Sequence, residues 1–172
     1  DVGHEKDAFL HYHDLGPNIR SWLKITRETL GGQRTDGDLT QFELEPETLK
    51  TGKIGDILKR NQTVLVQIAK EPISSKGPRL TTEISLAGKY FILVPFFDTV
   101  SVSRKVSTND ERKRLKNLAT SLKTPKLGLI CRTAAEQKGG QDLHKDILEI
   151  QARWSAIFKT LPTAEPCDRV LG

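Results

Sequence analysis

The second half of the fold is decided by residues 127–161, which read LGLICRTAAEQKGGQDLHKDILEIQARWSAIFKTL. The opening residues form an apolar run of the length expected for a buried strand. The later residues carry apolar side chains at spacings of four and three, which predicts a long helix with one buried face. The positions on that face are Leu143, Ile147, Ile150, Trp154, Ile157 and Leu161. Pro162 follows directly and ends the helix, because proline cannot continue it.

A second helix is predicted upstream of this stretch. Thr108 is followed three residues later by Glu111, which is a capping-box pattern that starts helices. Apolar residues then recur at helical spacing, at Leu115, Leu118, Ala119 and Leu122. Runs at 90–94 and 99–103 predict two more strands. Residues 84–172 therefore read as an α+β domain whose strands are covered by two helices.

The first half, residues 1–83, contains short strands separated by glycine and proline turns. The segment 1–14 is expected to be strand-like, and further strands are predicted at 63–70 and 80–84. Such strands with lysines in their loops are typical of a partial OB-type antiparallel β-barrel, which is a nucleic-acid-binding fold. The apolar spacing within 18–30 predicts a short amphipathic helix.

An acidic stretch, residues 31–47, separates this helix from the predicted strands. It has few aliphatic residues, and its carboxylates are Asp36, Asp38, Glu43, Glu45 and Glu47. We expect a mobile acidic loop. A solvated surface insertion is the alternative, since charged runs usually form solvated surfaces.

Composition narrows the function classes. The chain has 172 residues with 27 Lys and Arg against 22 Asp and Glu, a net charge of +5, which favours polyanionic partners. No apolar run approaches the roughly 20 residues of a transmembrane helix. The two cysteines, Cys131 and Cys167, lack metal-site spacing, so a reducing, cytoplasmic compartment fits best. The absence of methionine and the start at Asp1 suggest an excised fragment.

Arg132 and Thr133 are the leading phosphate-binding candidates. They follow directly on the predicted buried strand 127–131, which would fix where their side chains point. An arginine fork binds a phosphate through two bonds, and a threonine hydroxyl adds a third. A glycine such as Gly88 lets backbone N–H groups approach a phosphate closely. The alternative for Arg132 is a salt-bridged surface residue.

Three other residues are candidates for holding a nucleic-acid strand. Lys70 and Lys76 supply positive charge, and Phe9 offers an aromatic ring on which a base can stack. Phe9 could equally be a barrel core residue, and Lys76 could merely keep a turn soluble. The histidines His11 and His13 would share a face of a strand, but no second pair with ligand spacing accompanies them, which disfavours a metal site.

Four segments together resemble the ribonuclease E/G family of bacterial endoribonucleases. They are DVGHEKDAFL at 1–10, VLVQIAKE at 64–71, KGPRLTTEISLAGKY at 76–90 and LGLICRTA at 127–134. The resemblance spans nearly the whole chain except the acidic stretch. It implies an enzyme that cleaves single-stranded RNA in RNA processing and decay by metal-assisted phosphodiester hydrolysis.

The resemblance also assigns roles to residues. It implies an OB-type RNA-binding domain followed by a sensor domain that recognises a 5′-monophosphate on RNA. Arg132 and Thr133 would bind the 5′ phosphate, with Gly88 and Ile92 lining the same pocket. The RNA-binding surface would hold single-stranded RNA through Phe9, Lys70 and Lys76.

Other parts of the family pattern are expected outside this chain. The resemblance implies catalytic aspartates that hold Mg²⁺ and a zinc-binding cysteine pair beyond Gly172, together with barrel strands before Asp1. We therefore expect no catalytic or metal-binding residue here, no activity of the chain alone, and a full-length homo-oligomer. The segment 135–138 replaces glycines that the family tends to keep, which predicts a stiffer loop, with Glu136 opposing a phosphate.

Two other functions are consistent with the sequence. The chain could be a non-catalytic RNA-binding module without 5′-end preference. It could also be a structural element, in which the apolar face of 143–161 packs against another domain or subunit.

Overall fold

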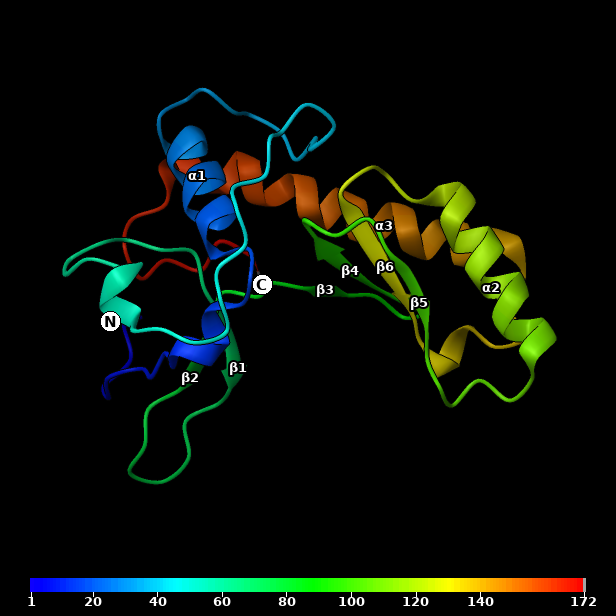
Figure 1. The fold of residues 1–172 in the computed structure, drawn as a ribbon, viewed down its shortest axis with the longest axis horizontal. Coiled ribbons are helices and arrows are strands. Elements are labelled where there is room, and N and C mark those ends of the chain that lie inside the picture. The colour runs from blue at the N-terminus through cyan, green and yellow to red at the C-terminus, as the bar shows by residue number, and fades with distance from the viewer. Residues whose placement is uncertain (172) are drawn as a thin grey trace. The chain divides into compact units, whose positions relative to one another are not determined.

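The computed structural model describes residues 1–171, and its fold is α+β, as the sequence predicts (Figure 1). The residues divide into two compact units. Unit 1 contains 1–36, 43–84 and the residues from 157 onward, and unit 2 contains 37–42 and 85–156. The chain therefore enters unit 2 twice.

Unit 2 is built on a four-stranded sheet with the strand order β3-β4-β6-β5. The strands are β3 (Leu86–Ala87), β4 (Phe91–Pro95), β5 (Val100–Val102) and β6 (Leu127–Cys131), and the helices are α2 (Asn109–Leu122) and α3 (Gly140–Thr160). β4 runs antiparallel to β3 and β6, whereas β5 runs parallel to β6. The predicted strands and both predicted helices are confirmed, within a few residues at their ends.

The two faces of this sheet differ because side chains alternate along each strand. Phe91, Leu93, Leu129 and Cys131 are buried on the face that the helices cover. The thiol of Cys131 donates to the carbonyl of Leu115 in α2, at 3.9 Å. The opposite face carries half-buried or exposed residues, among them Ile92, Val94 and Ile130.

The apolar face predicted along 143–161, most of which lies in α3, is used within the chain itself. Its residues are all at most 7% exposed; they are Leu143, Ile147, Ile150, Trp154, Ile157 and Leu161. The structural role that relied on this face being available for another domain is therefore not supported.

Part of the acidic stretch packs into the core, which the sequence did not predict: residues 37–42 belong to unit 2. The mobility of the stretch stays a prediction. Leu39 and Phe42 are buried, and the rings of Phe42 and Phe96 stack at 5.7 Å. Trp154 donates its indole N–H to the carbonyl of Gly37, at 2.8 Å. Leu39 and Phe42, two apolar residues among acidic neighbours, thus anchor residues 37–42 in the core of unit 2.

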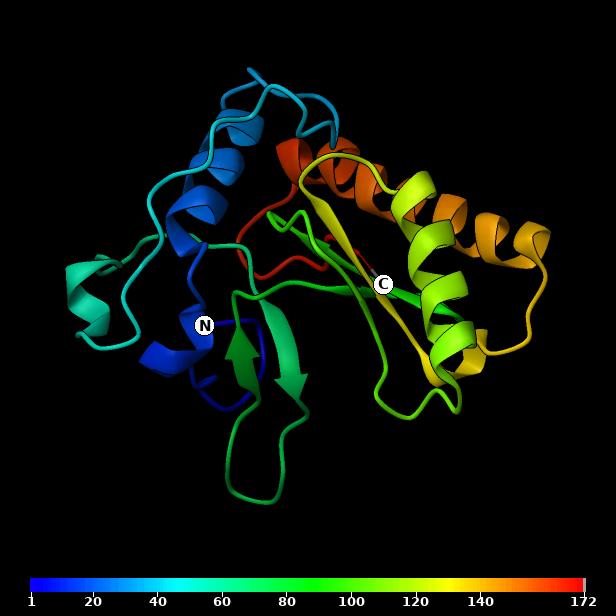
Figure 2. The same ribbon diagram turned by 45° about the vertical axis from the view of Figure 1, so that its right-hand side comes forward.

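Unit 1 combines one helix with a two-stranded sheet. α1 covers Ile19–Leu30, as predicted, and β1 (Gln67–Lys70) pairs antiparallel with β2 (Arg79–Thr81). Figure 2 shows these two strands side by side, joined by the loop 71–78. Three short 3₁₀ turns belong to the same unit: η1 (Tyr12–Leu15), η2 (Ile54–Asp56) and η4 (Leu161–Thr163).

The small sheet does not close into a barrel within residues 1–171. Segment 1–14 is not a strand but contributes one bridge, at Phe9, and a 3₁₀ turn. β2 ends at Thr81 because the next residue, Thr82, bonds to the η1 turn and not to another strand. Its backbone N–H donates to the carbonyl of Asp14, and its hydroxyl donates to the carbonyl of Leu15. The OB-type fold stays a prediction.

No helix within residues 1–171 is both long and apolar enough to cross a membrane.

Candidate functional site

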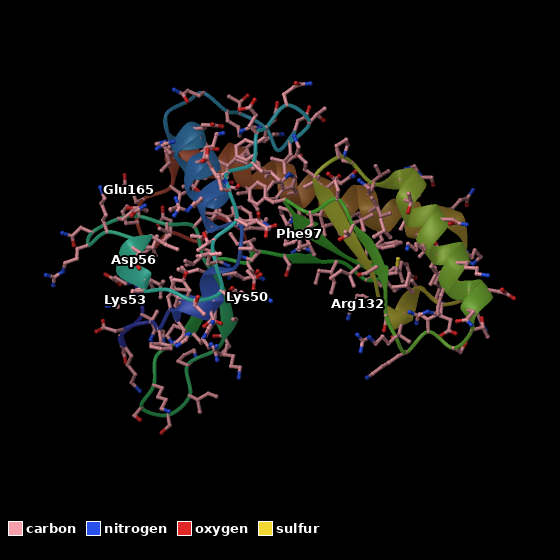
Figure 3. The ribbon with its side chains drawn as sticks, viewed as in Figure 1. Lys50, Lys53, Asp56, Phe97, Arg132 and Glu165 are labelled. Atoms are coloured by element: carbon pink, nitrogen blue, oxygen red, sulfur yellow. The ribbon has the colours of Figure 1, made fainter. Side chains whose placement is uncertain are left out.

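Arg132 lies at the end of β6 in unit 2, where Figure 3 labels it. Its backbone N–H donates to the carbonyl of Tyr90, at 2.8 Å. Its Nη1 donates to the carbonyls of Gly88, at 2.6 Å, and Lys89, at 3.3 Å. The residue is exposed, and no carboxylate in the described part of the chain pairs with its guanidinium. The arginine is thus oriented by backbone carbonyls rather than neutralised, unlike the salt-bridged alternative.

The turn that holds Arg132 is fixed by a buried carboxylate of α3. Asp146 is 5% exposed, and its two oxygens accept the backbone N–H groups of Lys89, Tyr90 and Phe91 at 2.7 to 2.9 Å. Sequence reasoning missed Asp146, although an acidic residue on an otherwise apolar helix face was a signal that could have found it.

Gly88 is required at this turn by its neighbours. A Cβ atom there would lie 2.5 Å from Cδ1 of Ile150 and 2.7 Å from a carboxylate oxygen of Asp146. Such contacts are far inside van der Waals distance, so any side chain would displace the turn from α3. Gly88 thus allows the backbone to reach Asp146 and to present a carbonyl to Arg132.

Thr133 begins a 3₁₀ turn, η3 (Thr133–Ala135), directly after Arg132. Its hydroxyl lies 3.1 Å from that of Ser103, which follows β5. This contact brings the next residues, Arg104 and Lys105, beside the end of β6, and both are exposed. These two cations were not among the candidates from the sequence, although they directly follow the predicted strand 99–103.

Ile92 lies on β4 opposite Ile130 of β6, on the sheet face that the helices do not cover. Ile92 is half-buried and Ile130 is 37% exposed. Alternation along β6 places Arg132 on the same face as Ile130. The structure therefore brings together all four residues of the predicted phosphate pocket and adds Ile130 to them.

The loop after Arg132 is held by two carboxylates. Glu136 accepts the backbone N–H of Ser107, at 3.0 Å, and also its hydroxyl. Glu111 accepts the backbone N–H of Gln137, at 2.8 Å. The predicted opposition of Glu136 to a bound phosphate stays a prediction, but the carboxylate has a local partner.

The three residues predicted to hold RNA belong to unit 1. Phe9 is 58% exposed, so the barrel-core alternative for it is wrong. The backbone of Phe9 pairs with Arg79, which in turn pairs with Lys70 across the β1–β2 ladder. Phe9 and Lys70 thus flank β2 on its two sides, with Arg79 between them. Lys76 is exposed in the loop between β1 and β2.

Arg79 is less available to bind a phosphate than its place between Phe9 and Lys70 suggests. Its guanidinium makes a two-bond ion pair with Asp14, at 2.9 Å for both bonds. The hydrogen bond from Arg79 lowers the pKa of the Asp14 carboxyl.

Two histidines extend the aromatic surface beside Phe9. The ring of His11 lies 6.1 Å from that of Phe9 and stacks on that of His13 at 4.9 Å. Among residues 1–171, no group of three or more His, Cys, Asp or Glu side chains is arranged to hold a metal ion. This row of rings was not predicted from the sequence, where the histidines were considered only as metal ligands.

This chain is similar in sequence to one family of known proteins. The model of the ribonuclease E/G family matches residues 85–171. Ribonuclease E of Synechocystis sp. (strain ATCC 27184 / PCC 6803 / Kazusa) is 35% identical over 148 residues, 85% of this chain and 22% of that protein. Ribonuclease E of Nostoc sp. (strain PCC 7120 / SAG 25.82 / UTEX 2576) is 38% identical with the same coverage.

A third relative is named ribonuclease G. Ribonuclease G of Escherichia coli (strain K12) is 30% identical over 159 residues, which are 92% of this chain and 29% of that protein. The chain thus spans less than a third of the length of these curated relatives.

Proposed function

The chain belongs to the ribonuclease E/G family, and we propose that it is the RNA-binding and 5′-end-sensing portion of an endoribonuclease that cleaves single-stranded RNA. In this proposal unit 2 binds the 5′-monophosphate and the β1–β2 sheet of unit 1 contacts the strand. The relatives are named ribonucleases, which supports RNA as the substrate class.

The observation that carries the proposal is the fixed, unpaired guanidinium of Arg132. Its Nη1 is held by the carbonyls of Gly88 and Lys89, so the side chain is oriented before a ligand arrives. A pre-oriented arginine binds an anion without a further cost of side-chain ordering. The hydroxyl of Thr133 and the exposed cations Arg104 and Lys105 add a donor and positive charge beside it.

The second part of the proposal concerns the surface around Phe9. An exposed aromatic ring beside a lysine is the combination that single-strand binders use, since bases stack on the ring while cations follow the phosphates. Phe9, Lys70 and Lys76 are all exposed on the same unit. This surface also favours the second candidate, an RNA-binding module without 5′-end preference.

We propose that RNA cleavage, and the metal ions that it needs, belong to other parts of the full-length protein. We propose that the catalytic aspartates with Mg²⁺ and the zinc-binding cysteines, which the family resemblance implies, lie outside this chain, which covers 22% to 29% of each of these relatives. The cytoplasmic location and the homo-oligomeric state of the full-length protein are further proposals that rest on the family resemblance.

Binding of one short single-stranded RNA, carrying either a 5′-monophosphate or a 5′-hydroxyl, tests the proposal. Fluorescence anisotropy should show tighter binding of the monophosphate form. Arg132→Ala should remove that difference, which we expect to be about tenfold because a hydrogen bond to a charged group contributes about 1.5–3 kcal/mol. Arg132→Lys, which keeps the charge but loses the fork, should lose part of it.

Lys145→Ala is the matched control, because its side chain is 78% exposed on α3 and its removal deletes the same charge. It should leave the preference for the monophosphate unchanged. Equal binding of both RNAs by the unaltered chain would refute the sensor and leave the RNA-binding module. No binding of either RNA would refute both candidates.

A further inference from the structure

The uncovered face of the unit 2 sheet continues from the Arg132 site toward the other end of β6. Because alternate residues share a face, Gly128, Ile130 and Arg132 point to the same side. β4 places Val94 opposite Gly128 and Ile92 opposite Ile130. The phosphate-binding arginine therefore stands at one end of an apolar surface that runs along β4 and β6.

This surface ends in a hollow of about 210 Å³ whose lining includes Phe97, Val94 and Ile130. Phe97 follows β4, whereas Arg132 follows β6; since these strands are antiparallel, the two residues lie toward opposite ends of the pair (Figure 3). Gly128 and Arg132 are four residues apart, or roughly 13 Å at 3.3 Å per residue.

Phe97 lies over Gly128 because that position has no side chain. A Cβ atom on Gly128 would be 3.1 Å from Cβ of Phe97 and 3.0 Å from the carbonyl oxygen of Thr99. Because Gly128 has no side chain, the bottom of the hollow stays unfilled. Phe97 is half-buried and lines one side of it. The hydroxyl residues Thr99 and Ser101 line the hollow as well and are exposed.

We propose that this hollow binds a nucleobase near the 5′ end of an RNA whose terminal phosphate lies on Arg132, with Phe97 as the stacking residue. The inference rests on the proposed function and adds a base subsite to it. A base is flat and apolar on its faces and carries polar edges, which suits an aromatic wall with hydroxyl groups beside it. The hollow is smaller than the roughly 300–1,000 Å³ of sites for drug-sized ligands, so it suits one planar ring system.

The positive charge around Arg132 favours an RNA end over an uncharged apolar partner. The surface is continuous with an arginine that no carboxylate neutralises within residues 1–171, and Lys89, Arg104 and Lys105 near it are exposed. A ligand that covers the apolar face and also reaches Arg132 must therefore combine flat apolar groups with negative charge. The 5′ end of an RNA strand has both.

The test is a set of 5′-monophosphorylated RNA hexamers in which one abasic nucleotide is moved through positions 1 to 4. In anisotropy with the whole chain, an abasic site at the base held by Phe97 should weaken binding about fivefold or more, in line with base–aromatic stacking. Phe97→Leu keeps an apolar side chain over Gly128 but removes the stacking ring. It should weaken the intact RNA by a similar factor and make the same abasic site neutral.

Two further variants complete the experiment. Ile130→Ala trims the surface between Phe97 and Arg132 and should weaken the intact RNA by a smaller factor. Leu148→Ala is the matched control, because Leu148 is 52% exposed on α3 and does not line the hollow; it should bind as the unaltered chain does. Thermal unfolding of each variant establishes that the fold is intact.

The outcomes separate the two proposals. If the monophosphate preference depends on Arg132 but Phe97→Leu binds every RNA like the unaltered chain, the subsite is refuted and the sensor stands. Equal weakening of 5′-monophosphate and 5′-hydroxyl RNA by Phe97→Leu would refute the assignment of the hollow to the 5′ end. If the unaltered chain has no monophosphate preference, both proposals fail.

Discussion

At the scale of single residues, the turn beside Arg132 depends on the carboxylate of Asp146. An asparagine there would replace one acceptor oxygen by an NH₂ group that faces backbone donors. We predict that Asp146→Asn lowers the free energy of unfolding by about 3 kcal/mol, since buried N–H groups would lose a charged partner. It should also weaken the monophosphate preference, because Gly88 and Lys89 position Arg132. Urea unfolding and anisotropy measure the two effects.

Glu149→Gln is the control for this prediction, since Glu149 lies on the same helix with a side chain that is 63% exposed. It should change the free energy of unfolding by less than about 0.5 kcal/mol. An Asp146→Asn variant that is as stable as the control would show that Asp146 does not hold the turn.

The two cysteines should differ in reactivity. Cys131 is buried on the covered face of β6, and burial raises the pKa of its thiol to about 11. Cys167 is an exposed free thiol. Because the thiolate is the reactive form, a thiol reagent at pH 8 should modify Cys167 alone in the folded chain and both residues after denaturation. Rapid labelling of Cys167→Ser in the folded state would contradict the burial of Cys131.

At the scale of elements, the start of α2 is held by a network around Glu111. The hydroxyl of Thr108 accepts the backbone N–H of Glu111 at 3.2 Å, which is half of the predicted capping box. The carboxylate of Glu111 instead accepts two bonds from Arg114, at 2.6 and 2.7 Å, and one from Gln137. This network joins α2 to the loop after Arg132.

The network makes stability depend on pH. The hydrogen bonds from Arg114, and then that from Gln137, lower the pKa of Glu111 from 4.5 to about 2. A carboxyl with a lowered pKa in the folded chain stabilises it above its unfolded pKa, and this contribution is lost as the pH falls through the folded value. We predict that Glu111→Gln costs about 1–2 kcal/mol at pH 7 and that the difference shrinks between pH 4.5 and 2.

Urea unfolding of both proteins at pH 7, 4 and 2.5 measures this difference, and the comparison cancels other carboxyls such as Asp14 and Asp98. Asp110→Asn, an exposed change in the same turn, should show a smaller effect. A Glu111→Gln difference that stays constant down to pH 2.5 would mean that the network does not lower the pKa of this carboxyl.

At the scale of the whole molecule, positive charge should govern RNA affinity. The chain carries a net +5, and each phosphate neutralised on a single strand adds about 0.7 to the slope of log K against log salt. Lys70→Ala and Lys76→Ala should each reduce that slope by about 0.7. Lys123→Ala should not, because Lys123 is paired with Asp98 at 2.9 Å. Unchanged slopes for both lysine variants would exclude the β1–β2 surface from the RNA interface.

Much of the architecture of unit 2 could be predicted from local patterns. The apolar run 127–131 and the spacing within 143–161 identify β6 and α3, and Thr108 marks the start of α2. The position of Arg132 at a strand end followed from the same patterns. Local spacing sufficed here because each of these elements buries one face, and the apolar residues of that face recur in the sequence with the period of a helix or a strand.

Unit 1 was predicted less well, because its short strands depend on partners distant in sequence. β1 and β2 are shorter than expected, and the segment 1–14 forms a bridge and a turn where a strand was predicted. Backbone pairing of this kind is decided by which donors and acceptors meet, and propensity does not report that.

By itself, therefore, the sequence determined the α+β class, the order of the main elements and the residues at the strand end. Only the tertiary structure decided that 37–42 joins the core of unit 2, that Asp146 fixes the turn of Gly88, and that Phe97 and Arg132 share one face of the sheet. The physical reason is that a periodic pattern records which side of an element is buried. The contact that buries it, or the backbone group that a carboxylate accepts, depends on residues up to more than a hundred positions away, as the bond from Trp154 to Gly37 illustrates.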